Sequence, residues 1–397
     1  MRYTPVKIVH VTNHLMPDMG YQEHFLAKYQ AKLGHEVHVV TSNRAYPVHE
    51  GYAAFSTAFP QRVLAVGVSS QDGYQVHRLA AYGEKHLQLF MRGILATLRS
   101  IDPDLVVMHS ITRYETLRVA AWKKLTGQRL RLVADDHSLY VVLEFDWKRR
   151  VYRGIVRFLL HQCGLLDTFH AVVPVTEETR RLLHEHYAIP LERMVVLPIS
   201  ADTSQFQFSQ AGRDRVREQL GIPTDFVVLG YYGKLSSERG VADAYEISRE
   251  LFARHPRFGL LFVGSGLDGE FARQLMARVE QDGFGRRVFW HGQVSHQELP
   301  AFYSAADIAT WPKFASMGCL EAASCGLPIV ISDLAVSRER TAAGNGFIWE
   351  SNEVAQRAVE RLICEPALRR EMGEKGKTFV REHFDWAAVA QKFLFQN

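Results

Sequence analysis

Two cations in the second half of the chain have the type and spacing to hold a phosphorylated ligand. Lys234 and Arg239 stand five residues apart in the segment 233–240, directly after the apolar run 226–231. A turn from a strand into a helix presents backbone amides that favour anions, and each charge-assisted hydrogen bond contributes roughly 1.5–3 kcal/mol. The pair is therefore predicted to clamp a diphosphate from two sides. Spacing alone fits a solvated surface loop equally well.

The segment 311–328 offers a second set of groups for the same ligand. An apolar run ends at Trp311, and a short helix is predicted to start near Met317 or Gly318. The first amides of such a helix would hold phosphate oxygens. Glu321 lies on its opening turn, where a carboxylate can accept both hydroxyls of a ribose. The alternative is that Glu321 only interacts favourably with the helix dipole.

Acid and histidine side chains end two predicted strands of the first half. Asp135, Asp136 and His137 follow the strand 130–134, and His109 ends the strand 105–109. His109 and Asp136 are candidates for the acceptor side of a site. The alternative for either histidine is a structural residue that hydrogen-bonds at a strand end. We prefer that alternative for His109 and a functional role for His137.

Two further motifs resemble sites of other protein classes. The segment 264–269 fits G-x-G-x-x-G after a strand, which suggests a dinucleotide-dependent oxidoreductase. Such a site also needs an acid at the end of the next strand, but residues 289–292, where that strand ends, include no acid. We therefore retain Gly264 only as a donor-binding candidate. Asp102 and Asp104 imitate a metal-binding DxD, but they most simply cap a helix end before a strand. No metal or cofactor is expected.

Apolar runs alternate with amphipathic helical patterns along the whole chain, which is typical of parallel βαβ units. Strands are predicted at 7–11, 36–41, 105–109, 130–134, 168–173, 194–197, 226–231, 259–263, 287–290, 308–311 and 328–331, and first-half helices at 21–33, 86–99, 115–125 and 177–186. The segment 44–73 is expected to be loop with a small hairpin. The predicted fold class is α/β, with two Rossmann-like doubly wound domains that face each other across a cleft. The predicted domains are 1–200 and 201–375, with a hinge near 198–210, and a helix in 376–397 is expected to cross back to the first domain.

Composition is that of a globular protein rather than a disordered one. The chain has 397 residues, of which 47% are hydrophobic and 23% charged. No 18-residue apolar window predicts a transmembrane helix, and the N-terminal segment lacks the apolar region of a signal peptide. Four cysteines without metal-type spacing are expected to be reduced thiols. These features predict a cytoplasmic protein.

Net charge is +4, but residues 1–200 carry 24 Lys and Arg against 18 Asp and Glu. This mildly basic half favours an anionic ligand or a membrane surface and is too weak to predict nucleic-acid binding. Residues 147–160 read as a basic amphipathic helix that could lie on the inner face of an anionic membrane. A helix that packs on the first sheet with a solvated basic face gives the same pattern.

Together these motifs resemble glycosyltransferase family 4, a group of retaining enzymes with the GT-B fold. The segment KLSSERG is followed later by a loop that ends LEAASCGLP, and VVLPISADTSQF, FVGSG and FWHGQVSHQELPAFYSAADI stand at family-like spacing. The N-terminal segment 6–42 is similar to the opening strand, glycine loop and first helix of the family. The likeness covers nearly the whole chain. It implies transfer of a sugar from a nucleotide-diphosphate donor to a glycan or lipid-linked acceptor, in cell-surface polysaccharide or glycoconjugate synthesis.

The resemblance also assigns roles to single residues. Lys234 and Arg239 match the basic pair of the family on the donor diphosphate, although the first is usually arginine. Glu321 matches the glutamate that holds the ribose, and a histidine commonly stands at the position of His137, near the reacting sugar. Gly20 matches a glycine of the family whose lack of a side chain lets the donor approach the backbone. Ser316 and Met317 match a loop of the family whose amides face the diphosphate.

One position departs from the family pattern. Lys313 stands where the family has a glutamate that contacts the transferred sugar. Three interpretations remain open: a shifted loop register, an unusual or acidic donor sugar, or an impaired enzyme. The second function to weigh is therefore a catalytically weak scaffold subunit that binds nucleotide sugar.

Overall fold

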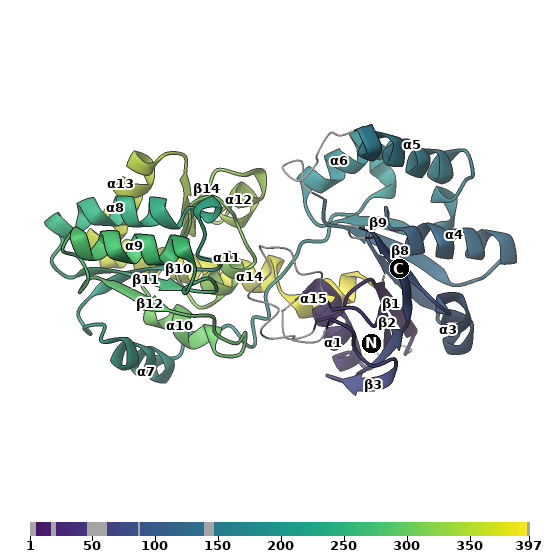
Figure 1. Ribbon diagram of the computed structural model, residues 1–397, viewed down its shortest axis with the longest axis horizontal. Coiled ribbons are helices and arrows are strands. Elements are labelled where there is room, and N and C mark those ends of the chain that lie inside the picture. The colour runs from purple at the N-terminus through teal and green to yellow at the C-terminus, as the bar shows by residue number, and fades with distance from the viewer. Residues whose placement is uncertain (1–4, 17–20, 46–61, 86–87, 139–146, 395–397) are drawn as a thin grey trace. The chain divides into compact units, whose positions relative to one another are not determined.

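The computed structural model describes residues 5–16, 21–45, 62–85, 88–138 and 147–394, and its chain divides into two compact units. The first unit contains Met1–Ile199 and Trp386–Asn397, and the second contains Ser200–Asp385. Each unit has its own α/β core (Figure 1). In the part of the chain that is described, no helix is both long and apolar enough to cross a bilayer.

The first unit is built on a seven-stranded sheet with the order β3-β4-β2-β1-β7-β8-β9. All neighbouring strands are parallel except β3 and β4, which form an antiparallel hairpin. The strands of this unit are β1 (Lys7–Thr12), β2 (Glu36–Ser42), β3 (Gly67–Gln71), β4 (Tyr74–Leu79), β7 (Leu105–His109), β8 (Arg131–Asp136) and β9 (Ala171–Pro174), with a separate hairpin of β5 (Ala81–Lys85) and β6 (Gln88–Met91). Because the central strands are buried on both faces, they read as continuous apolar runs.

Helices cover both faces of this sheet, as Figure 1 shows. One core contains side chains of α3 (Ile94–Ile101), α4 (Tyr114–Thr126), α5 (Trp147–His161) and α6 (Glu177–Tyr187). The core on the other face contains side chains of α1 (Gln22–Lys32) and α15 (Trp386–Lys392). Local signals set helix ends: Thr176 caps α6 by accepting the Thr179 amide, and Gly127 ends α4 at a positive φ.

The second unit repeats the plan around an all-parallel six-stranded sheet with the order β12-β11-β10-β13-β14-β15. Its strands are β10 (Val227–Tyr232), β11 (Phe258–Val263), β12 (Val288–His291), β13 (Ile308–Trp311), β14 (Ile329–Ser332) and β15 (Gly346–Trp349). Its helices are α7 (Gln210–Leu220), α8 (Val241–Arg254), α9 (Glu270–Gln281), α10 (Leu299–Ala305), α11 (Gly318–Ser324), α12 (Ala335–Arg340), α13 (Asn352–Cys364) and α14 (Pro366–His383). Helices α8, α9 and α13 pack on one face, and α7, α10, α11 and α14 on the other (Figure 1).

Two sequence predictions of local structure are wrong. The predicted helix 86–99 is a strand over Gln88–Met91 and becomes helical only at Ile94, after Gly93 at a positive φ. The predicted strand 194–197 makes one isolated bridge, between Met194 and Val172, and no ladder. A hairpin is expected within 44–73. Strand β3 lies in that segment, but its partner β4 lies beyond it, and the two are joined by a turn at Asp72 and Gly73, both at positive φ.

The C-terminal return to the first unit begins at Trp386 and not at residue 376. Residue 376 lies inside α14, where Gly373 and Gly376 let the helix approach the turn after α11. A Cβ at Gly373 would lie 2.2 Å from the carbonyl oxygen of Gly326. This close packing keeps α14 in the second unit, whereas α15 packs against α1 of the first.

Candidate active site

The two predicted donor segments follow neighbouring strands of the second sheet. Strand β10 leads into the loop with Lys234 and Arg239, and the adjacent strand β13 leads into the loop 312–317 and then α11. Gly240, at a φ of +77°, ends the first loop, and a Cβ there would lie 2.7 Å from Cβ of Pro312. The two loops are therefore in contact at the carboxyl edge of the sheet, where doubly wound folds bind ligands.

Lys234 and Arg239 are cations without an acidic partner in the described part of the chain. The Arg239 guanidinium lies over the ring of Phe314, 4.4 Å from its centroid. This stacking fixes the side chain against the loop after β13 while leaving its N–H groups available. The carbonyl oxygen of Lys234 accepts a hydrogen bond from the hydroxyl of Tyr231 at 3.0 Å, which fixes the backbone of the turn.

Gly264 lies after β11, on the other side of β10. Its φ is +158°, and a Cβ there would lie 1.7 Å from the carbonyl oxygen of Gly233. No side chain fits at this position, because the loops after β10 and β11 approach each other by their backbones. The observed role of Gly264 is thus to shape the turn that carries Lys234.

Glu321 is buried and held by two donors. One carboxylate oxygen accepts from Nε2 of His296 at 2.9 Å, and the other accepts from the hydroxyl of Tyr303 at 3.0 Å. Each oxygen keeps a second lone pair for a ligand hydroxyl. His296, in the segment after β12, and Tyr303, on α10, were not identified from the sequence, since no spacing pattern links them to Glu321.

The loop with Ser316 and Met317 is held from behind by Arg340 at the end of α12. The buried guanidinium donates from Nη1 to the carbonyl oxygens of Ala315 at 2.7 Å and Ser316 at 2.8 Å. Since C=O and N–H of one trans peptide point in opposite directions, this bond turns the Met317 amide away from Arg340. The Ser316 amide instead donates to the carbonyl oxygen of Phe314 at 3.2 Å.

Lys313 forms an ion pair with an acid of the helix that follows the neighbouring loop. Its Nζ lies 3.2 Å from Oδ2 of Asp243, in the first turn of α8, and the Lys313 side chain is 50% exposed. A carboxylate and an ammonium thus stand together at the position where the family pattern has a glutamate.

The acceptor-side candidates form a hydrogen-bonded network centred on Asp135. Its Oδ2 lies 2.6 Å from Nδ1 of His109 and accepts from Nε2 of Gln22 at 3.0 Å, and its Oδ1 accepts from the Ser110 amide at 2.9 Å. His137 Nε2 lies 3.6 Å from Oδ2 of Asp135, and the His137 side chain is 40% exposed. His109 and Asp135 are buried, so His137 is the outer member of this network.

The network extends inward from His109 to His10 on β1. Nδ1 of His10 lies 3.1 Å from Nε2 of His109, and Nε2 of His10 lies 2.7 Å from Oε1 of Gln30. Because an amide oxygen only accepts, His10 carries its proton on Nε2 and accepts at Nδ1 from His109. His109 therefore donates from both ring nitrogens.

Charges in the network follow from this geometry. Burial would raise the pKa of Asp135, but the facing histidines hold it well below its usual range. Desolvation opposes the charged forms of His109 and His137, yet the Asp135 carboxylate outweighs it, and the pKa of each is raised. Burial and the charge of His109 lower the pKa of His10 to about 3. Glu23, in the first turn of α1, adds negative potential toward both histidines.

Asp136 stabilises the turn around this network. Its Oδ2 accepts from the Ser110 hydroxyl at 3.0 Å, and its Oδ1 accepts from the Ser138 amide at 2.9 Å. Ser110 has a φ of +90°, an unusual conformation for a residue with a side chain. Gly20, the remaining candidate, lies outside the described residues.

Comparison with known proteins supplies the class of this molecule. Over 98% of both chains, the structure superposes on Anabaena Alr3699/HepE in complex with UDP with a TM-score of 0.70 at 15% identity. It superposes on the sucrose-phosphate synthase of Thermosynechococcus elongatus with a TM-score of 0.68 at 18% identity, covering 98% of this chain and 97% of that one. The two α/β units with parallel sheets have the GT-B glycosyltransferase fold, which confirms the predicted fold class.

The sequence comparisons narrow the class to a family. Residues 24–205 match the family described as Glycosyltransferase Family 4, and residues 212–379 match the family described as Glycosyl transferases group 1. A D-inositol 3-phosphate glycosyltransferase of Corynebacterium aurimucosum is 26% identical over 381 residues, which cover 92% of this chain and 86% of that protein. The chain belongs to glycosyltransferase family 4 and is a glycosyltransferase. The alternative of a dinucleotide-dependent oxidoreductase is therefore wrong.

Proposed function

We propose that the protein transfers a sugar from a nucleoside-diphosphate sugar to a glycan or lipid-linked acceptor, in cell-surface polysaccharide or glycoconjugate synthesis. The observation that carries the proposal is that Lys234 and Arg239 lie in the loop after β10, which contacts the loop after β13, and that Glu321 lies on α11 directly after that second loop. The solved Anabaena neighbour, in complex with UDP-glucose, supports a donor of this class. Retention of the anomeric configuration is proposed from family membership.

In the proposed reaction, the bond between the anomeric carbon and the diphosphate oxygen breaks, the acceptor hydroxyl oxygen bonds to the anomeric carbon, and the hydroxyl proton passes to the leaving diphosphate. Negative charge grows on the leaving diphosphate, where Lys234, Arg239 and the Met317 amide would stabilise it. Preorganised donors of this kind contribute about 10²–10³ in rate each. The proposal assigns charge neutralisation to these groups and calls on no metal ion or cofactor.

Glu321 would hold the ribose of the nucleotide. Its carboxylate is fixed by His296 and Tyr303, so its remaining lone pairs have a defined direction. Two ribose hydroxyls can then donate to it without a rearrangement of the side chain. His137, as the exposed member of the Asp135 network, would hydrogen-bond the donor sugar and orient it.

We also propose that α5 contacts an anionic membrane surface and that the enzyme works on the cytoplasmic side. Four apolar side chains on one side of α5 are exposed: Trp147, Val151, Ile155 and Phe158. The spacing of four, four and three residues places them in one stripe. Val156 and Leu160, on the opposite side of the helix, are buried in the core. Lys148, Arg150 and Arg157 flank the exposed stripe, which supports contact with acidic headgroups.

Replacing either donor-side cation tests the proposed reaction. Lys234→Met and Arg239→Met should each lower turnover of the preferred nucleotide sugar by about 10²–10³. The melting temperature should stay close to that of the wild type, because neither side chain forms an intramolecular ion pair among the described residues. Release of nucleoside diphosphate from a panel of UDP- and GDP-sugars, with and without membrane extract as acceptor, measures the rate.

A lysine of the same unit provides the matched control. Lys375 pairs with Glu371 on the exposed surface of α14, so Lys375→Met should leave turnover unchanged. Wild-type rates in both Lys234→Met and Arg239→Met would refute the assignment of the diphosphate site.

Lys313 keeps a second candidate function open. With an ammonium at the position of the family glutamate, and with Asp243 paired to it, the protein could bind nucleotide sugar as a scaffold subunit without turning it over. Binding of a donor with no release of nucleoside diphosphate, even with acceptor extract present, would favour this candidate over the enzyme.

A further inference from the structure

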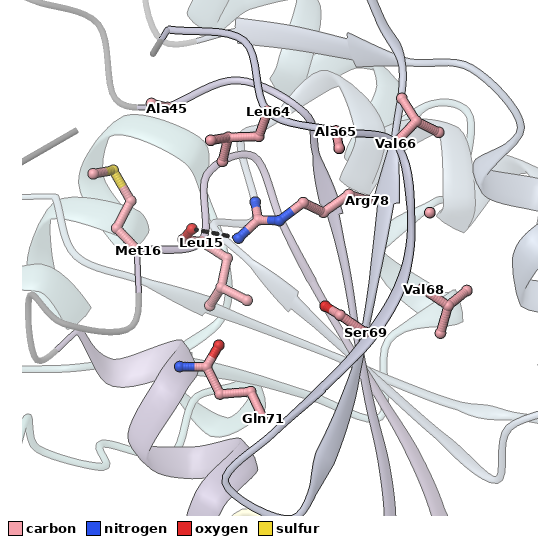
Figure 2. A pocket seen from close by; sticks show the side chains of 11 residues that line it. Leu15, Met16, Ala45, Leu64, Ala65, Val66, Val68, Ser69, Gln71 and Arg78 are labelled. Atoms are coloured by element: carbon pink, nitrogen blue, oxygen red, sulfur yellow. Dashed lines mark hydrogen bonds between the residues drawn. The ribbon is translucent and has the colours of Figure 1, made fainter. Parts of the chain in front are cut away.

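A cavity in the first unit contains an arginine among apolar side chains. The cavity has a volume of about 430 Å³ and lies between the segment after β1 and the β3–β4 hairpin, a size typical of small-molecule sites. Leu15, Met16, Leu64, Val66 and Val68 contribute apolar surface, and Figure 2 shows the Arg78 guanidinium between Leu15, Met16 and Leu64. Val66 and Val68 remain 58% and 65% exposed, so the cavity opens to solvent past the edge strand β3.

Arg78 has almost no hydrogen-bond partners there. Its Nη2 donates to the carbonyl oxygen of Leu15 at 3.4 Å, a long bond, and its buried Nη1 has no partner. In the described part of the chain no carboxylate pairs with Arg78, whereas nearby Arg62 is paired with Glu84. Burial lowers the pKa of Arg78, but an arginine stays charged at neutral pH. A half-buried charge with a buried, unpartnered N–H group and no counter-ion is unfavourable, and a bound anion would supply the missing partner.

The sheet places this cavity at the edge that carries the His137 network. Arg78 is near the carboxyl end of β4, and Leu15 and Met16 follow β1. Strands β4, β2, β1, β7 and β8 are consecutive and parallel, so their carboxyl ends lie at one edge of the sheet. Strand β1 also carries His10 of the network. A ligand in the cavity would therefore lie along the same edge as the residues assigned to the acceptor side.

Opposite Arg78, the hairpin leaves space for such a ligand. Gly67 pairs with Arg78 in the β3–β4 ladder, and a Cβ at Gly67 would meet no atom within 4 Å. Ser69 and Gln71 follow on the same side of β3 and line the same cavity, as Figure 2 shows. Directly opposite and next-but-one residues of a ladder share a face of the sheet. The cavity thus offers one cation, two polar groups and an apolar wall.

We propose that this cavity holds the acceptor and that the acceptor is an anionic amphiphile, with a phosphate or carboxylate bound to Arg78 and an apolar body on Leu15, Met16 and Leu64. This inference rests on the proposed glycosyl transfer and names the acceptor class for it. The apolar surface gives affinity for the body of the ligand, and the guanidinium gives specificity for the acid through paired N–H donors.

Binding of simple amphiphiles by the full chain tests the proposal. Decyl phosphate, decanoate, decanol and inorganic phosphate, each below its aggregation concentration, separate the contributions of the acid and the apolar body. We expect calorimetry to show that decyl phosphate or decanoate binds more tightly than decanol and inorganic phosphate. Whichever of the two acids binds more tightly identifies the acidic group. Equal affinity for decanol and both acids, or for inorganic phosphate and decyl phosphate, would overturn the proposal.

Variants locate the binding. Arg78→Met should weaken binding of the preferred acid by at least about tenfold, the effect of one charge-assisted hydrogen bond, while decanol binding stays the same. Arg78→Lys should restore most of the affinity. Ser69→Phe, which fills the cavity from the exposed edge strand, should reduce binding of both the acid and decanol. Arg129→Met removes an exposed arginine elsewhere in the unit and should change nothing.

The outcome is separable from that of the proposed reaction. Lys234→Met should bind decyl phosphate like the wild type, because the measurement needs no donor. If Arg78→Met and the wild type bind equally, the cavity is not the anion site even when donor turnover is intact. If Arg78 controls binding but no nucleotide sugar is turned over, the reaction fails and the cavity remains a ligand site.

Discussion

Asp135 sets the charge and orientation of the histidines around it. It is fully buried, and three donors bind its two oxygens: the consecutive residues His109 and Ser110, the latter through its amide, and Gln22 from α1. A buried carboxylate of this kind is stable only because it is paired and hydrogen-bonded. His137 then stands at the exposed end of a hydrogen-bonded array, which suits the role proposed for it, to position a sugar.

Replacing Asp135 should destabilise the first unit in a pH-dependent way. Asp135→Asn should lower the free energy of unfolding by about 3 kcal/mol, since removal of one partner leaves buried groups unpaired. The depressed pKa of Asp135 gives stability that is present above about pH 4 and is lost as the pH falls through its folded value. The raised pKa of His109 gives stability that is present below about pH 6.5 and is lost as the pH rises through its folded value.

The free energy of unfolding of the wild type should therefore exceed that of Asp135→Asn most between about pH 4 and 6.5. This difference in stability should shrink above and below that window. Urea unfolding at a series of pH values measures it. Asp333→Asn, which removes a surface ion pair with Arg338, is the control and should cost less than about 1 kcal/mol. A pH-independent difference between wild type and Asp135→Asn would contradict the assigned charges.

Among the secondary-structure elements, α5 is unusual because it carries apolar side chains on two sides, one buried and one exposed. Its buried side carries Val156 and Leu160 in the core of the first unit, while its exposed side carries the stripe from Trp147 to Phe158. Exposed apolar side chains scattered singly need no explanation, but a stripe along one helix marks an interaction surface. The flanking arginines decide which partner is favoured, since acidic headgroups supply the opposite charge.

Vesicle binding should depend on this charge. Arg150→Glu combined with Arg157→Glu should weaken binding to anionic vesicles at least about tenfold, because each basic residue near such a surface contributes about 1 kcal/mol. Co-sedimentation with phosphatidylserine–phosphatidylcholine vesicles measures the partition. Lys375→Glu combined with Arg381→Glu, on α14, changes the net charge by the same amount and should leave vesicle binding unchanged. Failure of the wild-type protein to bind anionic vesicles would end the membrane proposal.

At the scale of the whole molecule, the C-terminal segment belongs to the core of the first unit. Trp386, Val389, Phe393 and Leu394 are buried there with residues of α1 and the first sheet, and Trp386 stacks on Phe25 at 5.4 Å. The first unit is thus completed by residues that follow the entire second unit. Its folding depends on the end of the chain, while the core of the second unit is built from one continuous segment.

A chain that ends at Asp385 should lose the first unit selectively. Each large side chain buried contributes about 1.5–3 kcal/mol, so the loss of four is comparable to the whole stability of a domain. Calorimetry should show the first transition lost or strongly lowered, and the second unit should still melt cooperatively and bind nucleoside diphosphate. A chain that ends at Leu394 is the control. Two unchanged transitions in the shorter chain would show that α15 is dispensable.

Much of the fold could be predicted because strand and helix patterns are local. Predicted strands 105–109 and 308–311 coincide with β7 and β13, and most others differ by a few residues. The predictions failed where local pattern does not decide: 88–91 is a strand because β5 pairs with it, and 194–197 lies beside β9 without forming a ladder. No strand was predicted at β4, β5 or β15, and β3 was covered only by the hairpin expected within 44–73, since exposed edge strands such as β3 lack a continuous apolar run.

The sequence by itself determined the family, the two-unit α/β plan and the donor-side candidates Lys234, Arg239 and Glu321, because periodicity and ordered motifs are properties of short segments. Tertiary structure alone decided which groups meet. It placed Asp135 against His109, His296 and Tyr303 on Glu321, and Arg78 in a cavity without a counter-ion. These contacts join residues from different elements, and strand order and loop packing, which no local pattern encodes, bring them together.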